Sequence, residues 1–255
     1  MAKKTTKLDR RSLLTGAAAA SLAAAAGSLQ SESAAAQNAG AAGSAPGGKV
    51  SVSQRGVYEK VPLKQDVINV AAIQSQLYSI DLRDRANTLK RNLNRILRLI
   101  DLAQNSPEEW GGERRWGSKV DLIAMHEFPI QGFQPWNRKE LNQIAFDLPG
   151  PESEAIGERA KRYGCYISWG CYAKEKDWPD HVINMSVLTG PDGKIVSKQW
   201  KARNILGLFG DGALIGTTVY DVLDRYVEMY GWDAVMPVAR TDIGNIAITA
   251  VGAEP

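Results

Sequence analysis

The sequence is poor in the residues that bind metals and form disulfides, with two cysteines and two histidines among 255 residues. Cys165 and Cys171 lie six residues apart in one predicted strand. At about 3.3 Å per residue they would be roughly 20 Å apart, far beyond the ~7 Å that a disulfide can bridge. Together with His126 and His181 they show no metal-ligand spacing. We therefore expect no bond between the two cysteines, no metal site and no cofactor.

Long apolar runs are also lacking, which excludes a membrane span in the mature chain. The Ala-rich run from Leu13 to Ala26 covers about 14 residues, short of the roughly 20 that a spanning helix needs. It follows Arg10 and Arg11 and so resembles a twin-arginine export signal. We predict a signal peptide over residues 1–36, with cleavage after Ala36, and a periplasmic or extracellular protein. The alternative is a disordered basic tail.

An excess of basic charge is absent from the rest of the chain. Residues 1–36 hold five basic and two acidic residues, so they account for the whole formal charge of +3. No run of Lys and Arg with interleaved aromatic residues is present either. These two absences exclude a nucleic-acid partner.

What remains has the composition of a globular protein, 44% hydrophobic and 23% charged. The Gly- and Ala-rich stretch that starts at residue 37 predicts a flexible linker and N-terminal arm over 37–66, followed by one domain over 67–255. Apolar patterning and turn residues predict these elements, in order: strand 67–74, helix 81–104, a loop containing Pro107, strand 120–128, helix 152–162, strand 165–173, hairpin 182–200, helix 218–231 and strand 244–251.

This order indicates an α/β protein with a mixed sheet. The last strand is apolar enough to be buried on both faces, so we expect further structure beyond Pro255 and a domain that is incomplete at its C-terminal end.

Two charged residues stand where strands end. Glu127 follows the strand 120–128 at the edge where α/β sheets place ligands, and Lys201 ends the second strand of the hairpin. Either residue alone is more commonly a solvated surface group. Brought together in one pocket, a carboxylate and an amine can act as base and electrophilic partner.

The motifs around these residues resemble those of the nitrilase, or carbon-nitrogen hydrolase, superfamily. One motif is a strand that ends in Glu127, with Gly132 and Phe133 five and six positions further on. The other is the hairpin "INMSVLTGPDGKIVSKQWK", which carries Asn184 and ends at Lys201. The resemblance implies an αββα sandwich with mixed sheets. It also implies a small-molecule amide or nitrile as substrate, hydrolysis through a thioester, and assembly into a homo-oligomer.

The resemblance also implies roles for single residues. Glu127 would be the general base, and Lys201 would stabilise the oxyanion of the tetrahedral intermediate. Glu175 is the best match to a further glutamate of the family. His126 stands where the family usually has proline, and we expect it to pack on the opposite side of the strand from Glu127.

The nucleophilic cysteine of the resemblance has no counterpart. Counting from Gly244 places it at Val251, and counting back from Pro255 places it at Thr249. A threonine hydroxyl is a far weaker acid than a thiol, and Cys165 is expected to be a small core residue. Two hypotheses follow. The protein is an amide hydrolase with an altered nucleophile, an activated water or Thr249, or it is a silent member that binds an amide or serves as a scaffold.

Overall fold

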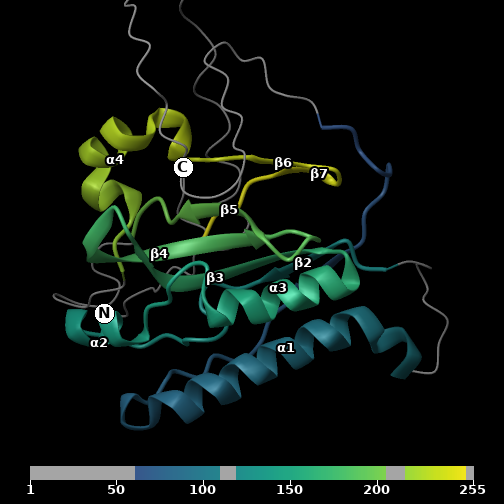
Figure 1. The fold of residues 1–255 in the computed structure, drawn as a ribbon, viewed down its shortest axis with the longest axis horizontal. Coiled ribbons are helices and arrows are strands. Elements are labelled where there is room, and N and C mark those ends of the chain that lie inside the picture. Colours follow the sequence, from purple (N-terminus) through teal and green to yellow (C-terminus); the bar gives the residue numbers. More distant parts are fainter. Residues whose placement is uncertain (1–60, 110–118, 205–215, 251–255) are drawn as a thin grey trace, which may run out of the picture. The chain divides into compact units, whose positions relative to one another are not determined.

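The computed structural model describes residues 61–109, 119–204 and 216–250. The chain divides into two units, Met1–Ala41 and Ala42–Pro255, and all described residues belong to the second (Figure 1). The predicted signal peptide and most of the linker lie outside the described residues. Their boundaries stay predictions.

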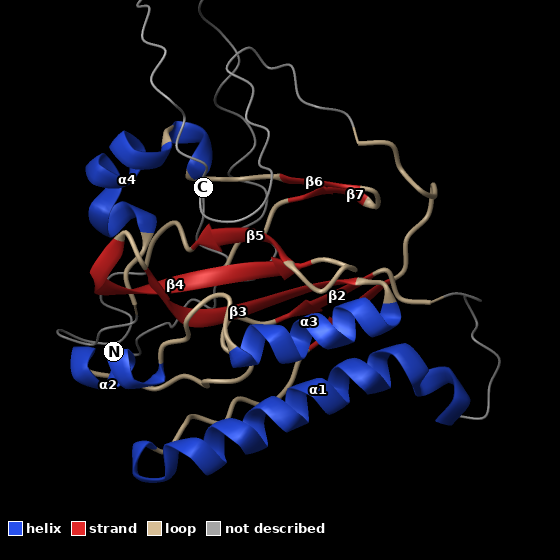
Figure 2. Cartoon of the chain, in the orientation of Figure 1, coloured by secondary structure: helices blue, strands red, loops and turns tan. Residues whose placement is uncertain are grey.

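A five-stranded sheet forms the centre of the second unit (Figure 2). Its first three strands are parallel and its last two are antiparallel hairpin strands, which confirms the predicted mixed sheet. The order in the sheet follows the order in the chain: β1 (Val70–Ile73), β2 (Leu122–Met125), β3 (Tyr166–Glu175), β4 (Trp178–Thr189) and β5 (Ile195–Trp200).

Helices join the parallel strands and lie on one face of the sheet. Figure 1 shows α1 and α3 side by side beneath the strands. The helical elements are η1 (Leu82–Asp84), α1 (Arg85–Glu109), α2 (Arg138–Ile144), α3 (Pro151–Tyr163), η2 (Val219–Val222), α4 (Leu223–Tyr230) and η3 (Trp232–Ala234). Within the described ranges, no helix is both long and apolar enough to cross a membrane.

Two helix predictions differ from the structure. The first helix continues to Glu109, past Pro107, where the sequence predicted a loop. Proline removes one N–H donor from the helix. Only two residues of the helix follow Pro107, so the remaining backbone hydrogen bonds are enough to hold its last turn. The helix α2 was not predicted at all. Its signal was a capping box, because Asn137 and Glu140 bond to each other's backbone N–H at the start of the helix.

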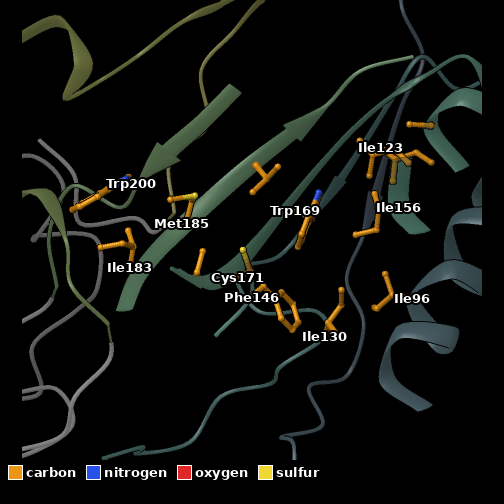
Figure 3. Close-up of a cluster of buried hydrophobic side chains, with 14 of the residues drawn as sticks. Ile96, Ile123, Ile130, Phe146, Ile156, Trp169, Cys171, Ile183, Met185 and Trp200 are labelled. Atoms are coloured by element: carbon orange, nitrogen blue, oxygen red, sulfur yellow. The ribbon is translucent and has the colours of Figure 1, made fainter. Parts of the chain in front are cut away.

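The main core lies between the helices and the sheet. Figure 3 shows Ile96 of α1 and Ile156 of α3 near Ile123 and Trp169 of the strands, and all four are almost fully buried. Burying one such side chain contributes about 1.5–3 kcal/mol. Alternate residues of β2 and β3 therefore face the helices, which directs the residues between them to the other face.

That other face is covered by a short antiparallel hairpin, β6 (Ala239–Thr241) and β7 (Gly244–Ile246). Ala239 and Ile243 pack there with Tyr166 and Leu188 of the main sheet. The prediction of a strand over 244–251 that is buried on both faces was wrong: β7 has three residues. A two-stranded ribbon with one face on the sheet buries only alternate residues, and Thr249 is exposed.

Candidate active site

The structure brings Glu127 and Lys201 together. Glu127 follows the C-terminal end of β2, and Lys201 follows the last residue of β5. Lys201 Nζ lies 2.8 Å from Glu127 Oε1. The side chain of Lys201 is 8% exposed and that of Glu127 is 26% exposed, so the ammonium is buried and the carboxylate reaches a surface from which a small molecule can approach.

Asn184, in the middle of β4, binds both members of this pair. Its side-chain Nδ2 donates to Glu127 Oε1 at 2.7 Å, and its backbone carbonyl accepts from the backbone N–H of Lys201 at 2.9 Å. The backbone N–H of Asn184 donates in turn to the carbonyl of Thr217. Hydrogen bonds to a charged group contribute about 1.5–3 kcal/mol. One residue of the sheet therefore holds both the Glu127 carboxylate and the backbone from which the Lys201 side chain extends.

Two glycines allow the backbone near Glu127 to approach its neighbours. A Cβ on Gly170 of β3 would collide with the carbonyl oxygen of Glu127. Gly132 has φ 71°, and a Cβ there would collide with the backbone of Ser79 and Tyr78. Side chains are excluded at both positions, because the segment that carries Glu127 packs directly on β3 and the loop after β1.

Two buried polar atoms, on residues that bond to Glu127 or feel its charge, have no hydrogen-bond partner in the described part of the chain. They are the hydroxyl of Tyr172 and Oδ1 of Asn184, on residues that are 0% and 1% exposed. Tyr172 lies directly across from Asn184 in the register of β3 and β4. Burial, and secondly the charge of Glu127, raise the pKa of Tyr172, so its hydroxyl stays protonated.

The structure places Glu175 elsewhere. Its carboxylate accepts from Lys198 Nζ at 2.6 Å, and both side chains are nearly buried. Lys198 pairs with Val187 in the register of β4 and β5, and Val187 faces opposite to Asn184 because the two are three residues apart on one strand. A register shift follows Ala173 at the end of β3. Glu175 and Glu127 are therefore not brought together, and a catalytic role of Glu175 stays a prediction without geometric support.

The structure does not place either predicted nucleophile position at the Glu127 pair. Thr249 is exposed, and Val251 lies outside the described residues. Cys165 and Cys171 are free and fully buried, which confirms that they do not bond to each other. Burial raises the pKa of both thiols, so neither is present as a reactive thiolate.

The chain nevertheless returns to this region after β7. The backbone N–H of Ile248 donates to Oε1 of Gln199 at 3.1 Å. Gln199 lies in β5 two residues before Lys201, and residues two apart along an extended chain point to the same side. The segment that precedes the predicted nucleophile positions thus crosses the face of the sheet that carries the ion pair.

His126 turns away from the ion pair and toward β1. Its Nε2 lies 2.8 Å from the hydroxyl of Ser75. Burial lowers the pKa of His126, with the positive charge of Arg95 acting in the same direction, while Glu127 opposes both. The neutral imidazole is therefore the favoured form near neutral pH. This contact was not predicted from the sequence.

One cavity of the described part of the chain lies away from the ion pair. A cavity of about 440 Å³ lies beside Lys198, lined also by Ser153, Glu154 and Lys194, and neither Glu127 nor Lys201 lines it. In the ranges that the structure describes, no group of three His, Cys, Asp or Glu side chains is arranged to hold a metal ion. The site consists of a carboxylate, an ammonium and polar neutral groups.

A family model described as carbon-nitrogen hydrolase matches residues 69–254. A crystal structure of an N-terminal amidase is 16% identical with a TM-score of 0.44, and the match covers 56% of this chain and 30% of that one. Nit3 of Saccharomyces cerevisiae, a member of branch 10 of the nitrilase superfamily, is 16% identical with a TM-score of 0.40, covering 53% of this chain and 44% of that one.

An amidase from Nesterenkonia sp. is 14% identical with a TM-score of 0.37, covering 59% of this chain and 48% of that one. The matched part is thus less than half of each of these three proteins. No curated protein gives a significant match. Since the family model matches most of the chain, including the Glu127 motif and the hairpin that leads to Lys201, this protein belongs to the carbon-nitrogen hydrolase family.

Proposed function

We propose that the protein hydrolyses the carbon-nitrogen bond of small non-peptide amides at the Glu127 and Lys201 pair. The observation that supports this is the 2.8 Å contact between the two side chains, with Asn184 Nδ2 donating to the same carboxylate oxygen. A general base and a cation that share one small volume are what amide hydrolysis requires.

In this proposal a water molecule is the nucleophile. Glu127 accepts a proton from the water, whose oxygen forms a bond to the carbonyl carbon of the amide. Negative charge develops on the carbonyl oxygen next to the Lys201 ammonium. Glu127 then returns the proton to the nitrogen as the carbon-nitrogen bond breaks, so one amide and one water give a carboxylic acid and ammonia. In a variant of this scheme the Thr249 hydroxyl attacks instead and its proton passes through Glu127 to the departing ammonia. Water then hydrolyses the ester that has formed, which regenerates Thr249 and gives the carboxylic acid.

The test is release of ammonia from propionamide by the full chain and by Glu127→Gln. The substitution keeps the shape and removes the base, so the rate is expected to fall about 10²–10⁴-fold. Glu158→Gln is the matched control, because Glu158 is exposed on α3, and it should leave the rate unchanged. No turnover by the full chain across a panel of amides would reject the proposal.

The second candidate is a silent protein that binds an amide at the same site or serves as a scaffold. Two observations favour it: both described thiols are buried with raised pKa values, and Thr249 is exposed. In that case propionamide binds without release of ammonia. Saturable turnover that scales with protein concentration would contradict it.

We further propose that the protein is exported by the twin-arginine route and acts as a homo-oligomer. Support for export comes from Arg10, Arg11 and the apolar run that follows them. Replacing both arginines by lysine is expected to keep the protein in the cytoplasm, as measured by cell fractionation. Sedimentation of the purified protein measures its oligomeric state, and a monomer at all concentrations would reject the proposed homo-oligomer.

A further inference from the structure

The cavity beside Lys198 is large enough to hold a small molecule. Its volume of about 440 Å³ lies within the range of small-molecule binding sites, roughly 300–1,000 Å³. Three parts of the chain line it: the loop before α3 with the first turn of that helix, the turn between β4 and β5, and β5 itself. The apolar part of the wall comes from Leu148, Pro149 and Ile195.

A register shift in β5 aims two different side chains into this cavity. Regular alternation would place Ile195 and Lys198 on opposite faces of the sheet, because they are three residues apart. The pairing with β4 shifts between Leu188 and Thr189, where β5 has one extra residue. An extra residue of this kind re-aims the side chains that follow it. An apolar wall and an ammonium group therefore share one cavity.

Lys198 brings hydrogen-bond donors that its protein partner does not use. Its side chain is 10% exposed, and Nζ donates to Glu175 Oε1 at 2.6 Å. An ammonium has three N–H donors, and in the described ranges this is the one hydrogen bond that Nζ makes. The buried hydroxyl of Ser153 in the same lining is already satisfied, because it donates to the carbonyl of Gly150 and accepts from its N–H, both at 2.9 Å. The lysine is therefore the polar group that a ligand meets.

The charges around the cavity indicate an uncharged ligand. Glu175 neutralises Lys198 within the buried pair, and the two exposed charged residues of the lining, Glu154 and Lys194, are of opposite sign. A bound carboxylate would set a second negative charge beside the ammonium that already faces Glu175, where little water screens the repulsion. A carbonyl oxygen accepts a hydrogen bond from the ammonium without this repulsion.

We propose that this cavity binds small uncharged carbonyl compounds with an apolar body. The carbonyl oxygen accepts from Lys198 Nζ, and the apolar body packs on Leu148, Pro149 and Ile195. This second binding site goes beyond the proposed hydrolysis and does not depend on it. A chain that binds such a compound and releases no ammonia from propionamide would reject the hydrolysis and leave the inference standing.

The experiment compares two ligands of nearly the same shape, 4-phenylbutan-2-one and 3-phenylpropionate, which carry a methyl ketone and a carboxylate at the same place. Saturation-transfer NMR titration measures their dissociation constants for the full chain. The ketone is expected to bind at least about tenfold more tightly, because the carboxylate meets the charge of Glu175. Equal or tighter binding of the carboxylate would overturn the inference, and so would the absence of binding by the ketone.

A double variant removes the ammonium without leaving a buried charge behind. Glu175→Leu combined with Lys198→Met replaces the ion pair by apolar side chains of similar size, an exchange that often leaves stability unchanged or raises it. The melting temperature should therefore hold, while the ketone binds at least about tenfold more weakly, because a hydrogen bond to a charged group is lost. Unchanged affinity for the ketone in the folded double variant would overturn the role of Lys198.

Filling the cavity tests where the ligand lies. Ile195→Phe places a larger side chain in the wall, so the ketone should lose most of its affinity. Val196→Phe is the matched control, because the next residue of β5 packs with Tyr166 and Leu188 on the other face of the sheet, and affinity should stay. Melting temperatures show that both variants are folded. Equal affinity of the two variants for the ketone would place the ligand elsewhere and overturn the inference.

Discussion

Two glutamate-lysine pairs lie on opposite faces of the same sheet and differ in their surroundings. Glu127 and Lys201 are 2.8 Å apart and Glu175 and Lys198 are 2.6 Å apart. At the first pair Asn184 supplies a further bond, and two polar atoms near it stay unpaired. At the second, within the described ranges, no other hydrogen bond reaches the carboxylate.

The difference shows that a buried ion pair does not by itself mark a site of chemistry. Breaking either pair leaves an unpaired charge in a poorly hydrated position, and that cost is structural. What sets the first pair apart is unused hydrogen-bonding capacity next to a carboxylate that solvent can reach. In the second pair Glu175 and Lys198 bond to each other, and this bond joins the end of β3 to β5.

The largest expected effect is on stability, from Lys198→Met. It leaves the Glu175 carboxylate nearly buried without its cation, and we expect the free energy of unfolding to fall by about 3–5 kcal/mol. Urea denaturation measures it. Propionamide binding by the folded variant should not change, whereas Lys201→Met should abolish the proposed hydrolysis. Loss of amide binding in folded Lys198→Met would give both pairs the same role.

The next effect is that of Asn184→Leu, which removes the amide from Glu127 and leaves the size of the side chain similar. We expect a loss of about 2 kcal/mol in the free energy of unfolding, since the lost bond is to a charged group. Asn92→Leu is the control, because Asn92 is equally buried and bonds only to backbone carbonyls. If only the first variant weakens propionamide binding, Asn184 belongs to the site.

A smaller effect concerns His126. Its folded-state pKa lies below the unfolded value of about 6.5, so the folded protein holds fewer protons, and stability is full above that pH and lost as the pH falls through the folded pKa. His126→Gln should flatten this loss in denaturation curves between pH 7.5 and 5.

The same histidine distinguishes the two glutamates. Because the charge of Glu127 raises the pKa of His126, Glu127→Gln should lower that pKa further in an NMR titration, and Glu175→Gln should leave it in place. An equal shift in both variants would contradict the separation of the two pairs.

The smallest expected effect is that of Cys171→Ala. Removing one buried sulfur costs about 1 kcal/mol of stability, and the proposed hydrolysis should continue. The native protein should also resist thiol reagents, because burial holds the thiol in its neutral form. Rapid modification of Cys171 together with loss of turnover would show that a thiol serves as nucleophile after all.

Much of the fold could be predicted from the sequence because it depends on local patterns. Apolar runs gave the parallel strands, and the turn in "GPDGK" gave the hairpin of β4 and β5. The motifs around Glu127 and Lys201 indicated that the two belong together, but the sheet alone does not join them, because β3 and β4 lie between β2 and β5. The contact forms because the segment after β2 passes over Gly170 of β3 and its carboxylate reaches Asn184 of β4 and Lys201.

The rest depends on contacts between distant segments. Glu175 was assigned by its distance along the chain, but a register shift after Ala173 and the alternation of β5 join it to Lys198. Gly170 and Tyr172 lie in a strand whose residues are buried on both faces, so no periodicity sets them apart. The contact of Ser75 with His126 could not be predicted from the sequence, because it depends on β1 and β2 being neighbours and on their register.

The double role of Asn184 has a mechanical consequence. Its own peptide carbonyl holds the backbone of Lys201 and its own carboxamide holds the Glu127 carboxylate, so the base of the lysine side chain and the carboxylate are both anchored to a single residue. Thermal breathing that displaces Asn184 would carry the lysine backbone and the carboxylate with it.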